Sequence, residues 1–326
     1  MSGKNKPDMG EIMEAIFGSV SRVLHRGRFR AAGAILFTAV AAILLVSSAA
    51  FATEGGGSVY AGGNEDFMSG ALPPPGFYFI NYTNYYWADR FNDGHGNSVV
   101  PGFRVSAVVD ALRFIYVTNV KILGLDYGMH AIVPIVNLNV HVPGQKKSIT
   151  EVGDVTFDPL VLAWHSRNLH AVAGLDINLP VGGYDVTSIA NAGRNYWNLE
   201  PALAFTYLSD GGFEASSKFM YDFNFKNDKT EYLSGEEFHF DYTIAYHIKN
   251  WGLGVGGFYY KQTTDDKQYG LKVGLDGLKG QAFAIGPQVK YDYKNMSFIL
   301  KYQKEMAVEN RPEGDKLWFK FIYAFK

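Results

Sequence analysis

The stretch from Phe213 to Lys249 constrains the fold more than any other part of the chain. In two long runs, 213–226 and 237–249, charged or polar residues occupy alternate positions and aromatic residues lie between them. Successive side chains leave a β-strand on opposite faces, so this pattern predicts two strands, each with a charged and an aromatic face. Both runs exceed the roughly 5–6 residues that are usual in soluble sheets. The aromatic faces therefore indicate strands that meet lipid.

The alternation assigns candidate residues to the two faces. The charged face, with a similar row near residue 170, predicts lumen-lining positions at Glu214, Lys218, Asp222, Lys226, Glu237, His239, Asp241, His247, His170 and Asp176. The aromatic face, with that of the final segment, predicts lipid-facing positions at Phe219, Tyr221, Phe223, Phe240, Tyr242, Phe319, Phe321 and Tyr323. Charges of both signs can pair across a wet lumen, where they either set solute preference or brace a narrow barrel.

The N-terminal part of the sequence has the layout of an export signal. Basic residues between Arg22 and Arg30 precede an apolar run from Ala31 to Val46, and Ala50-Phe51-Ala52 follows. This arrangement is typical of a secretory signal peptide, so we expect residues 1–52 to be removed by cleavage after Ala52. An uncleaved membrane anchor is the alternative, because the apolar run extended to Ala52 could span a bilayer. No later segment is apolar enough for a helical span.

The remaining chain divides into an irregular segment and a series of strands. Residues 53–75 are rich in glycine and proline, and we expect them either to hang loose or to act as a plug. Residues 76–326 contain twelve candidate strands, near 76–90, 102–119, 126–142, 152–166, 168–182, 195–209, 213–227, 236–249, 251–264, 280–293, 296–310 and 314–326. An even number of strands permits the first and last strands to pair and close a barrel.

The connections between these segments alternate in length. Those after even-numbered segments are short, as at Asn250, whereas those after odd-numbered segments are mostly long and polar, as at 265–279. Only the connection at 311–313 departs from this rule. Short periplasmic turns and long extracellular loops are characteristic of outer-membrane barrels. The sequence therefore predicts an all-β, closed antiparallel transmembrane barrel of about 12 strands in the bacterial outer membrane.

Composition excludes several other classes. The chain has no cysteine, which excludes disulfides and thiolate metal sites, and its net charge of -2 argues against a nucleic-acid partner. His239 and His247 lie eight residues apart, roughly 26 Å along a strand, too far to share a metal ion. His165 and Ser166 are neighbours on opposite faces and cannot form a catalytic pair. We therefore expect no catalytic residue, no cofactor and no metal.

Several glycine, proline and aromatic landmarks resemble a known family. They are Leu72-Pro73-Pro74-Pro75-Gly76-Phe77-Tyr78, Phe103-Arg104-Val105 through Lys121-Ile122-Leu123-Gly124, Tyr127-Gly128 with Pro134, Gly153-Asp154 with Asp158-Pro159 and Trp164, and Leu179-Pro180-Val181-Gly182-Gly183-Tyr184. This pattern, which extends over residues 70–326, resembles the family associated with the meta-pathway of phenol degradation. The resemblance implies an outer-membrane transporter barrel linked to the uptake of hydrophobic or aromatic compounds.

Three functions remain open from the sequence. The first is a passive outer-membrane channel for small hydrophobic or aromatic solutes, and the second is a non-conducting structural or adhesive barrel. The third, a lipid-modifying barrel enzyme, would need a serine and a histidine that meet on the lipid-facing wall. The expected partners are outer-membrane lipid, a small hydrophobic or aromatic solute, and the barrel-assembly machinery. An aromatic row on the final strand resembles the assembly signal of outer-membrane proteins.

Overall fold

Seventeen strands make up the described fold, which the computed structural model gives for residue 54 and for residues 57–274 and 277–325. Twelve of them form the barrel wall: β1 (Gly76–Phe91), β2 (Arg104–Ile122), β3 (Leu125–Val142), β5 (Val155–His165), β6 (Leu169–Leu179), β7 (Asn198–Leu208), β8 (Phe213–Asn224), β11 (Glu237–Ile248), β12 (Trp251–Gln262), β15 (Gln281–Tyr293), β16 (Met296–Glu309) and β17 (Pro312–Ala324). The expected signal peptide, residues 1–52, lies outside the described residues.

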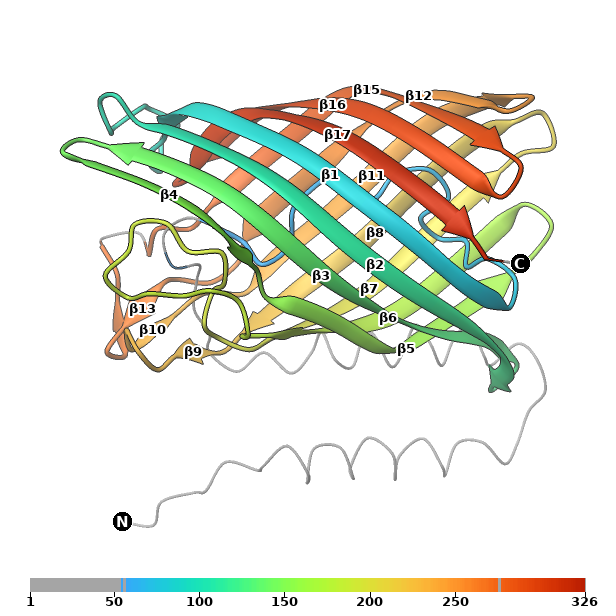
Figure 1. Cartoon of the computed structure of the whole chain (residues 1–326), viewed down its shortest axis with the longest axis horizontal. Coiled ribbons are helices and arrows are strands. Elements are labelled where there is room, and N and C mark those ends of the chain that lie inside the picture. Colours follow the sequence, from blue (N-terminus) through green and yellow to red (C-terminus); the bar gives the residue numbers. More distant parts are fainter. Residues whose placement is uncertain (1–53, 55–56, 275–276, 326) are drawn as a thin grey trace, which may run out of the picture. The chain divides into compact units, whose positions relative to one another are not determined.

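The wall closes on itself because β1 pairs with strands at both of its edges. It is antiparallel to β2 along one edge, where Tyr82 faces Ala111, and antiparallel to β17 along the other, where Tyr82 faces Lys320. Every other wall strand pairs with the strands before and after it, and Figure 1 shows these strands crossing the barrel at a common tilt. The prediction of a closed antiparallel barrel with 12 strands is confirmed. Among the described residues, no helix is long and apolar enough to cross a bilayer.

The connections alternate in length around the barrel as the sequence predicts. One end carries short turns such as residues 123–124, 166–168 and 249–250, and we call it the short-turn end. The opposite, long-loop end carries the longer connections 180–197 and 263–280. Positive φ angles of 54° at Lys249 and 84° at Gly124 allow the chain to reverse within two residues. The connection between β16 and β17, residues 310–311, is the short exception at the long-loop end.

Five short strands lie at the long-loop end in addition to the twelve wall strands. Strand β4 (Gln145–Val152) folds back on β3 as a hairpin, where the sequence predicts only a polar connection at 143–151. Hydroxyl and amide side chains link this hairpin, because Asn137 donates to Thr150 and Ser148 donates to Asn139. The loops also form a small four-stranded sheet: β9 (Lys226–Asn227), β10 (Tyr232–Leu233), β13 (Lys267–Gln268) and β14 (Leu271–Lys272).

The barrel is inverted relative to a soluble protein, with apolar side chains outside and charges inside. On β11, Ile244 and Tyr246 are about half exposed, whereas Asp241, in the other face, is 1% exposed. Charged side chains buried between strands of a soluble sheet would be costly. A lipid solvent accounts for this distribution, because it accepts the aromatic face and leaves the polar groups to pair inside.

Candidate functional site

A segment of the chain that precedes the first wall strand runs through the barrel interior. Residues 57–75, the lead segment, are drawn in blue inside the wall in Figure 1. At the long-loop end, the backbone N–H of Glu54 donates to the Ser234 hydroxyl at 2.7 Å. At the other end the segment continues into β1 at Gly76. The lead segment therefore crosses the lumen, the space enclosed by the wall, from the long-loop end to the short-turn end.

Inward-facing oxygen atoms of β7, β8 and β11 accept hydrogen bonds from the lead segment. The Asp241 carboxylate accepts from the N–H groups of Gly63 at 2.8 Å and Glu65 at 2.9 Å, and from the Tyr60 hydroxyl at 2.6 Å. The N–H of Met68 donates to Glu214 at 2.6 Å. Because the lead segment has no strand partner, these side chains satisfy backbone donors that would otherwise be buried without a partner.

Lysines of the last two strands satisfy the carbonyl groups of the same segment. The Lys301 ammonium donates to the carbonyls of Gly63 at 2.8 Å and Asn64 at 2.9 Å, and lies 2.8 Å from the Asp66 carboxylate. Lys316 donates to the Gly62 carbonyl at 2.9 Å, and Lys320 lies 3.1 Å from Asp66. Strands β11, β16 and β17 thus hold the lead segment from two sides, with acceptors on one and donors on the other.

A second group of buried charges lies beside the lead segment on β3, β5, β6, β7, β8 and β11. Its ion pairs join Asp158 and Asp176 to His130, Asp176 and Glu200 to Lys218, and Glu200 and Asp222 to His239. Within these pairs, four carboxyl groups face one lysine and two histidines. Arg113 lies next to this group and pairs with Glu65 of the lead segment at 2.7 Å.

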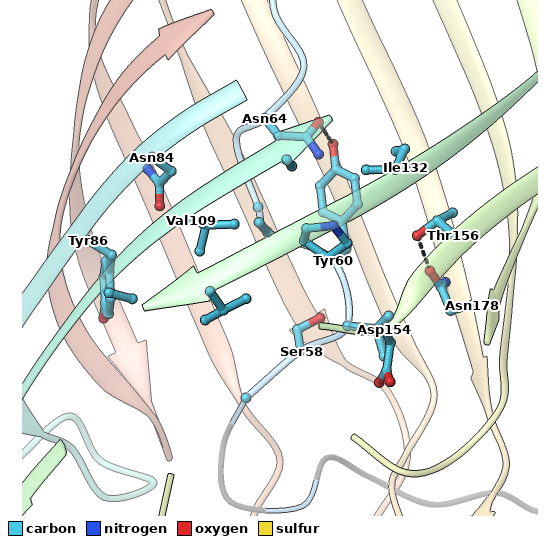
Figure 2. Close-up of a pocket in the computed structure, with 18 of the residues that line it drawn as sticks. Ser58, Tyr60, Asn64, Asn84, Tyr86, Val109, Ile132, Asp154, Thr156 and Asn178 are labelled. Carbon is cyan, nitrogen blue, oxygen red and sulfur yellow. Dashed lines mark hydrogen bonds between the residues drawn. The ribbon is translucent and has the colours of Figure 1, made fainter. Parts of the chain in front are cut away.

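A cavity of about 360 Å³ lies between the lead segment and the wall. Its apolar side is formed by inward-facing residues of β2 and β3: Ala107, Val109, Ala111, Ile132, Pro134, Val136 and Leu138. Aromatic residues, among them Tyr60, Tyr86, Phe258 and Tyr260, line it as well. Figure 2 shows Tyr60 projecting from the lead segment among these strands, with its hydroxyl bonded to Asn64. Residues 191–194 and 311–312 place the cavity toward the long-loop end.

Most of the predicted lumen candidates come together inside the barrel. Glu214, Asp222, Glu237, His239 and Asp241 are each 0–1% exposed, and the side chains of Lys218 and Asp176 are 11% and 7% exposed. His247 bonds to Glu214 through Nε2. His170 occupies the same face of β6 as Asp176, but lies near the short-turn end, with its Nδ1 3.0 Å from that of His165.

Lys226 lies apart from the other lumen candidates. Strand β8 ends at Asn224, and the N–H of Phe225 bonds to the Trp197 carbonyl one residue beyond the last β7–β8 pair. Lys226 therefore belongs to β9 in the loop sheet, where it pairs with Asp228 at 3.2 Å and Glu231 at 2.8 Å. The alternation of polar and aromatic residues continues to Lys226, two residues beyond the end of β8 at Asn224. The pattern therefore predicts a strand that is too long.

The predicted lipid-facing residues all lie on the outer face of the wall. Phe219 and Phe319 are 37% and 43% exposed. Outward aromatic residues also contact one another in pairs: Phe219 with Phe240, Tyr221 with Phe223, Phe240 with Tyr242, Tyr242 with Phe283, and Phe321 with both Phe298 and Tyr323. These contacts place one group of aromatic side chains on β8, β11 and β15 and a second one on β16 and β17.

The sequence interpretation does not single out several residues that hold the interior together. These are Arg113, His130, Asp158, Glu200, Lys301, Lys316 and Lys320. For the three lysines a signal exists, because Lys316 and Lys320 alternate with the outward Leu317 and Phe319. Lys301 likewise lies between the outward Leu300 and Tyr302. For Asp158 the alternation gives no guide, since β5 is irregular between Phe157 and Leu162.

Asp266 makes the long-loop end sensitive to pH. Burial raises the pKa of its carboxyl to about 8, and the nearby Glu237 and Glu54 add to that rise. An unfolded aspartate has a pKa of about 3.9, so folding disfavours its charged form, and the cost grows as pH rises between these two values.

We expect protease cleavage of loop 263–280 to be faster at about pH 9 than at about pH 6, and this difference to vanish in Asp266→Asn. Asp265→Asn is the control, because Lys279 and Lys272 lower the pKa of Asp265. Equal cleavage at both pH values in the unmodified protein would contradict the prediction.

The described part of the chain contains no serine hydroxyl that bonds to a histidine ring; the Ser166 hydroxyl bonds to the Leu169 backbone instead. The buried histidines face carboxylates, and this arrangement can hold charges and backbone in place.

Comparison with solved structures places the fold among outer-membrane barrels. The chain is similar to an outer membrane channel from Pseudomonas putida F1, with 16% identity, 79% of this chain and 98% of that chain covered, and a TM-score of 0.72. It is more distantly similar to the β domain of the Bordetella autotransporter BrkA, with 10% identity, 77% and 100% coverage, and a TM-score of 0.45. No curated protein matches the sequence.

A family model matches residues 88–321, which is most of the chain and includes all of the wall except most of β1 and the end of β17. The model is described as "Putative MetA-pathway of phenol degradation". The matched region contains the cavity strands β2 and β3 and the buried charges on β5 to β11. The chain therefore belongs to the phenol-degradation family of outer-membrane barrel proteins.

Proposed function

We propose that the protein is an outer-membrane channel for passive uptake of small hydrophobic or aromatic compounds. The observation that carries this proposal is the cavity near the long-loop end, with an apolar side on β2 and β3 and several aromatic side chains around it. Ligand cavities of a few hundred Å³ with mostly apolar walls and a few polar groups suit small organic molecules. Membership of a family associated with phenol degradation supports the same class of solute.

In this proposal the two sets of predicted residues have separate roles. The buried charged residues of β6, β8 and β11 line the lumen, and the outward aromatic residues contact outer-membrane lipid. The lead segment acts as a plug below the cavity, so a solute enters from the long-loop side and must pass this segment. The signal peptide would direct export and be cleaved after Ala52, and the barrel-assembly machinery would insert the wall.

Filling the cavity should reduce uptake. Val109 lines the cavity from β2, whereas Val108, its neighbour, is 42% exposed on the outer face. We expect Val109→Trp to reduce uptake of phenol-sized solutes into proteoliposomes, because the larger indole side chain extends into the 360 Å³ space. Val108→Trp is the matched control and should transport as the unmodified protein does, since its ring points into lipid. Equal transport by the two variants, or no transport by the unmodified protein, would sink the channel proposal.

A non-conducting structural barrel is the second candidate, and one observation favours it. The charged residues of the lumen are paired with one another and with the lead segment, so the described interior is braced as well as occupied. A barrel with this function would transport no solute whether or not its cavity is filled. The proteoliposome experiment separates the two candidates, since only a channel gives transport that Val109→Trp reduces.

A further inference from the structure

Three buried ligand-type side chains meet where β3, β5 and β6 lie side by side. His130, Asp158 and Asp176 are 4%, 2% and 5% exposed, and their ligand atoms all lie within 4.8 Å of one another. The His130 Nε2 atom is 3.3 Å from Asp176 Oδ1 and 3.8 Å from Asp158 Oδ2. Neither the channel proposal nor the contacts with the lead segment accounts for this group.

The irregularity of β5 is what brings Asp158 into the group. Asp158 faces His130 across the β3–β5 pairing, but residues 158–161 have no regular partner on β6. The Asp158 carboxylate instead accepts the N–H groups of Leu160 at 2.7 Å and Leu175 at 3.1 Å, in the space that a side chain at Gly174 would occupy. A bulge of this kind re-aims a side chain, and here it directs a carboxylate toward a histidine and a second carboxylate.

The facing atoms of the group are not hydrogen-bonded to one another. Asp176 Oδ1 has no hydrogen-bond partner, although it points at His130 Nε2, and His130 Nδ1 also lacks one. The other oxygen of Asp176 is 3.5 Å from Lys218, which it shares with Glu200. A buried carboxylate oxygen without a partner is costly.

A bound cation would satisfy all three groups at once. Zinc-class ions bind histidine nitrogen and carboxylate oxygen at about 2.0–2.2 Å, so tetrahedral ligands are about 3.4 Å apart. The observed separations of 3.3 and 3.8 Å are close to that value. His130 and Asp176 also line the cavity, so a fourth coordination position would face the space where a solute lies.

The neighbouring group of Glu200, Asp222 and His239 meets the same distance criterion but is a weaker candidate. Its His239 Nε2 already hydrogen-bonds to Asp222 at 2.7 Å, and Asp222 accepts a further bond from Asn198 at 2.8 Å. A proton on His239 satisfies this group without a metal. It therefore provides a control of matched chemistry in the same lumen.

We propose that His130, Asp158 and Asp176 form a binding site for one divalent cation of the zinc class, with an exchangeable position open to the cavity. This proposal does not depend on transport. The test uses the complete barrel refolded in detergent micelles, with Zn²⁺ titrated by calorimetry and Co²⁺ by the visible absorption of tetrahedral cobalt. The expected result is one saturable equivalent of each ion.

Variants assign the binding to these residues. His130→Gln and Asp176→Asn should weaken Zn²⁺ binding by at least about tenfold, whereas His239→Gln should leave it unchanged. Lys218→Met should tighten it by at least about threefold, because a positive charge is removed from beside Asp176. Folding of each variant is checked by its heat-dependent migration in gels. No saturable binding by the unmodified protein, equal losses in His130→Gln and His239→Gln, or weaker binding by folded Lys218→Met would overturn the proposal.

Discussion

Replacement of Lys301 by methionine is expected to release the lead segment from the wall and to destabilise the barrel by about 3 kcal/mol or more. The Lys301 side chain is 1% exposed, and its ammonium group binds the carbonyls of Gly63 and Asn64 and the carboxylate of Asp66. Methionine fills a similar volume but leaves the Asn64 carbonyl without its lysine donor, and it leaves the Gly63 carbonyl with Gln303 alone and Asp66 with Lys320 alone. A buried charge that loses a partner is strongly destabilising. The lead segment should therefore leave the position in which it needs the Lys301 ammonium group.

The measurement combines urea unfolding of the barrel in lipid vesicles with protease accessibility of residues 57–75. Lys304→Met is the matched control, since Lys304 is on the same strand but points outward, with 62% of its side chain exposed. Its pair with Asp315 at 3.5 Å is an exposed one, worth at most about 1 kcal/mol. If Lys301→Met and Lys304→Met had the same stability and the same cleavage pattern, the lead segment would not be held as described here.

The wall of the barrel could be predicted from the sequence because its causes are local. Each strand alternates polar residues that face the lumen with apolar residues that face lipid. This pattern persists from Phe213 through Ile248 with one reversal at the loop. The lengths of the connections also predict the order of the strands. A two-residue reversal such as that at Lys249 can join only strands that lie next to each other. Both signals can be read within a few residues of each position, so no long-range contact had to be known.

The interior could be predicted only in part, because its partners are distant in sequence. That Asp241 faces inward follows from alternation, but its bonds to Gly63 and Glu65 join residues more than 170 positions apart. The inward position of Asp158 depends on the β5 bulge, and alternation counted from Ala163, a buried residue beyond the bulge, puts Asp158 on the outer face. A pattern of single residues cannot contain either kind of information.

The two groups of charges have different consequences for a solute. Lys301 and Lys316 bind backbone carbonyls of the lead segment, and Lys301 and Lys320 bind its Asp66 carboxylate, so these lysines fix its position. The second group of buried charges, which surrounds Lys218, instead borders the cavity through His130, Asp176 and Glu200. A solute in the cavity therefore meets apolar side chains on β2 and β3 and a polar surface on the opposite side. In the channel proposal, release past the polar surface requires the lead segment to move.

Deletion of residues 57–70 is expected to convert the barrel into an open pore, and this is the largest effect predicted here. In the intact protein these residues cross the lumen and are held by Asp241, Glu214 and Lys301. Without them the same side chains remain on the wall, where water can enter and hydrate them, and twelve strands enclose more space than side chains alone fill. Single-channel conductance in planar bilayers should rise from near background to a steady open level, and uptake should lose its preference for small apolar solutes.

A deletion of residues 144–147 is the control, because it removes the exposed tip of the β3–β4 hairpin and leaves the lumen unchanged. That variant should conduct like the unmodified protein. If the 57–70 deletion folds, as judged by heat-dependent migration in gels, and still conducts no ions, the lead segment is not what closes the lumen. The paired charges of β6, β7, β8 and β11 would then be sufficient to block it, which is the result that a structural barrel requires. An open pore in the deletion variant, with little conduction in the intact protein, would mean that passage of a solute depends on displacement of the lead segment.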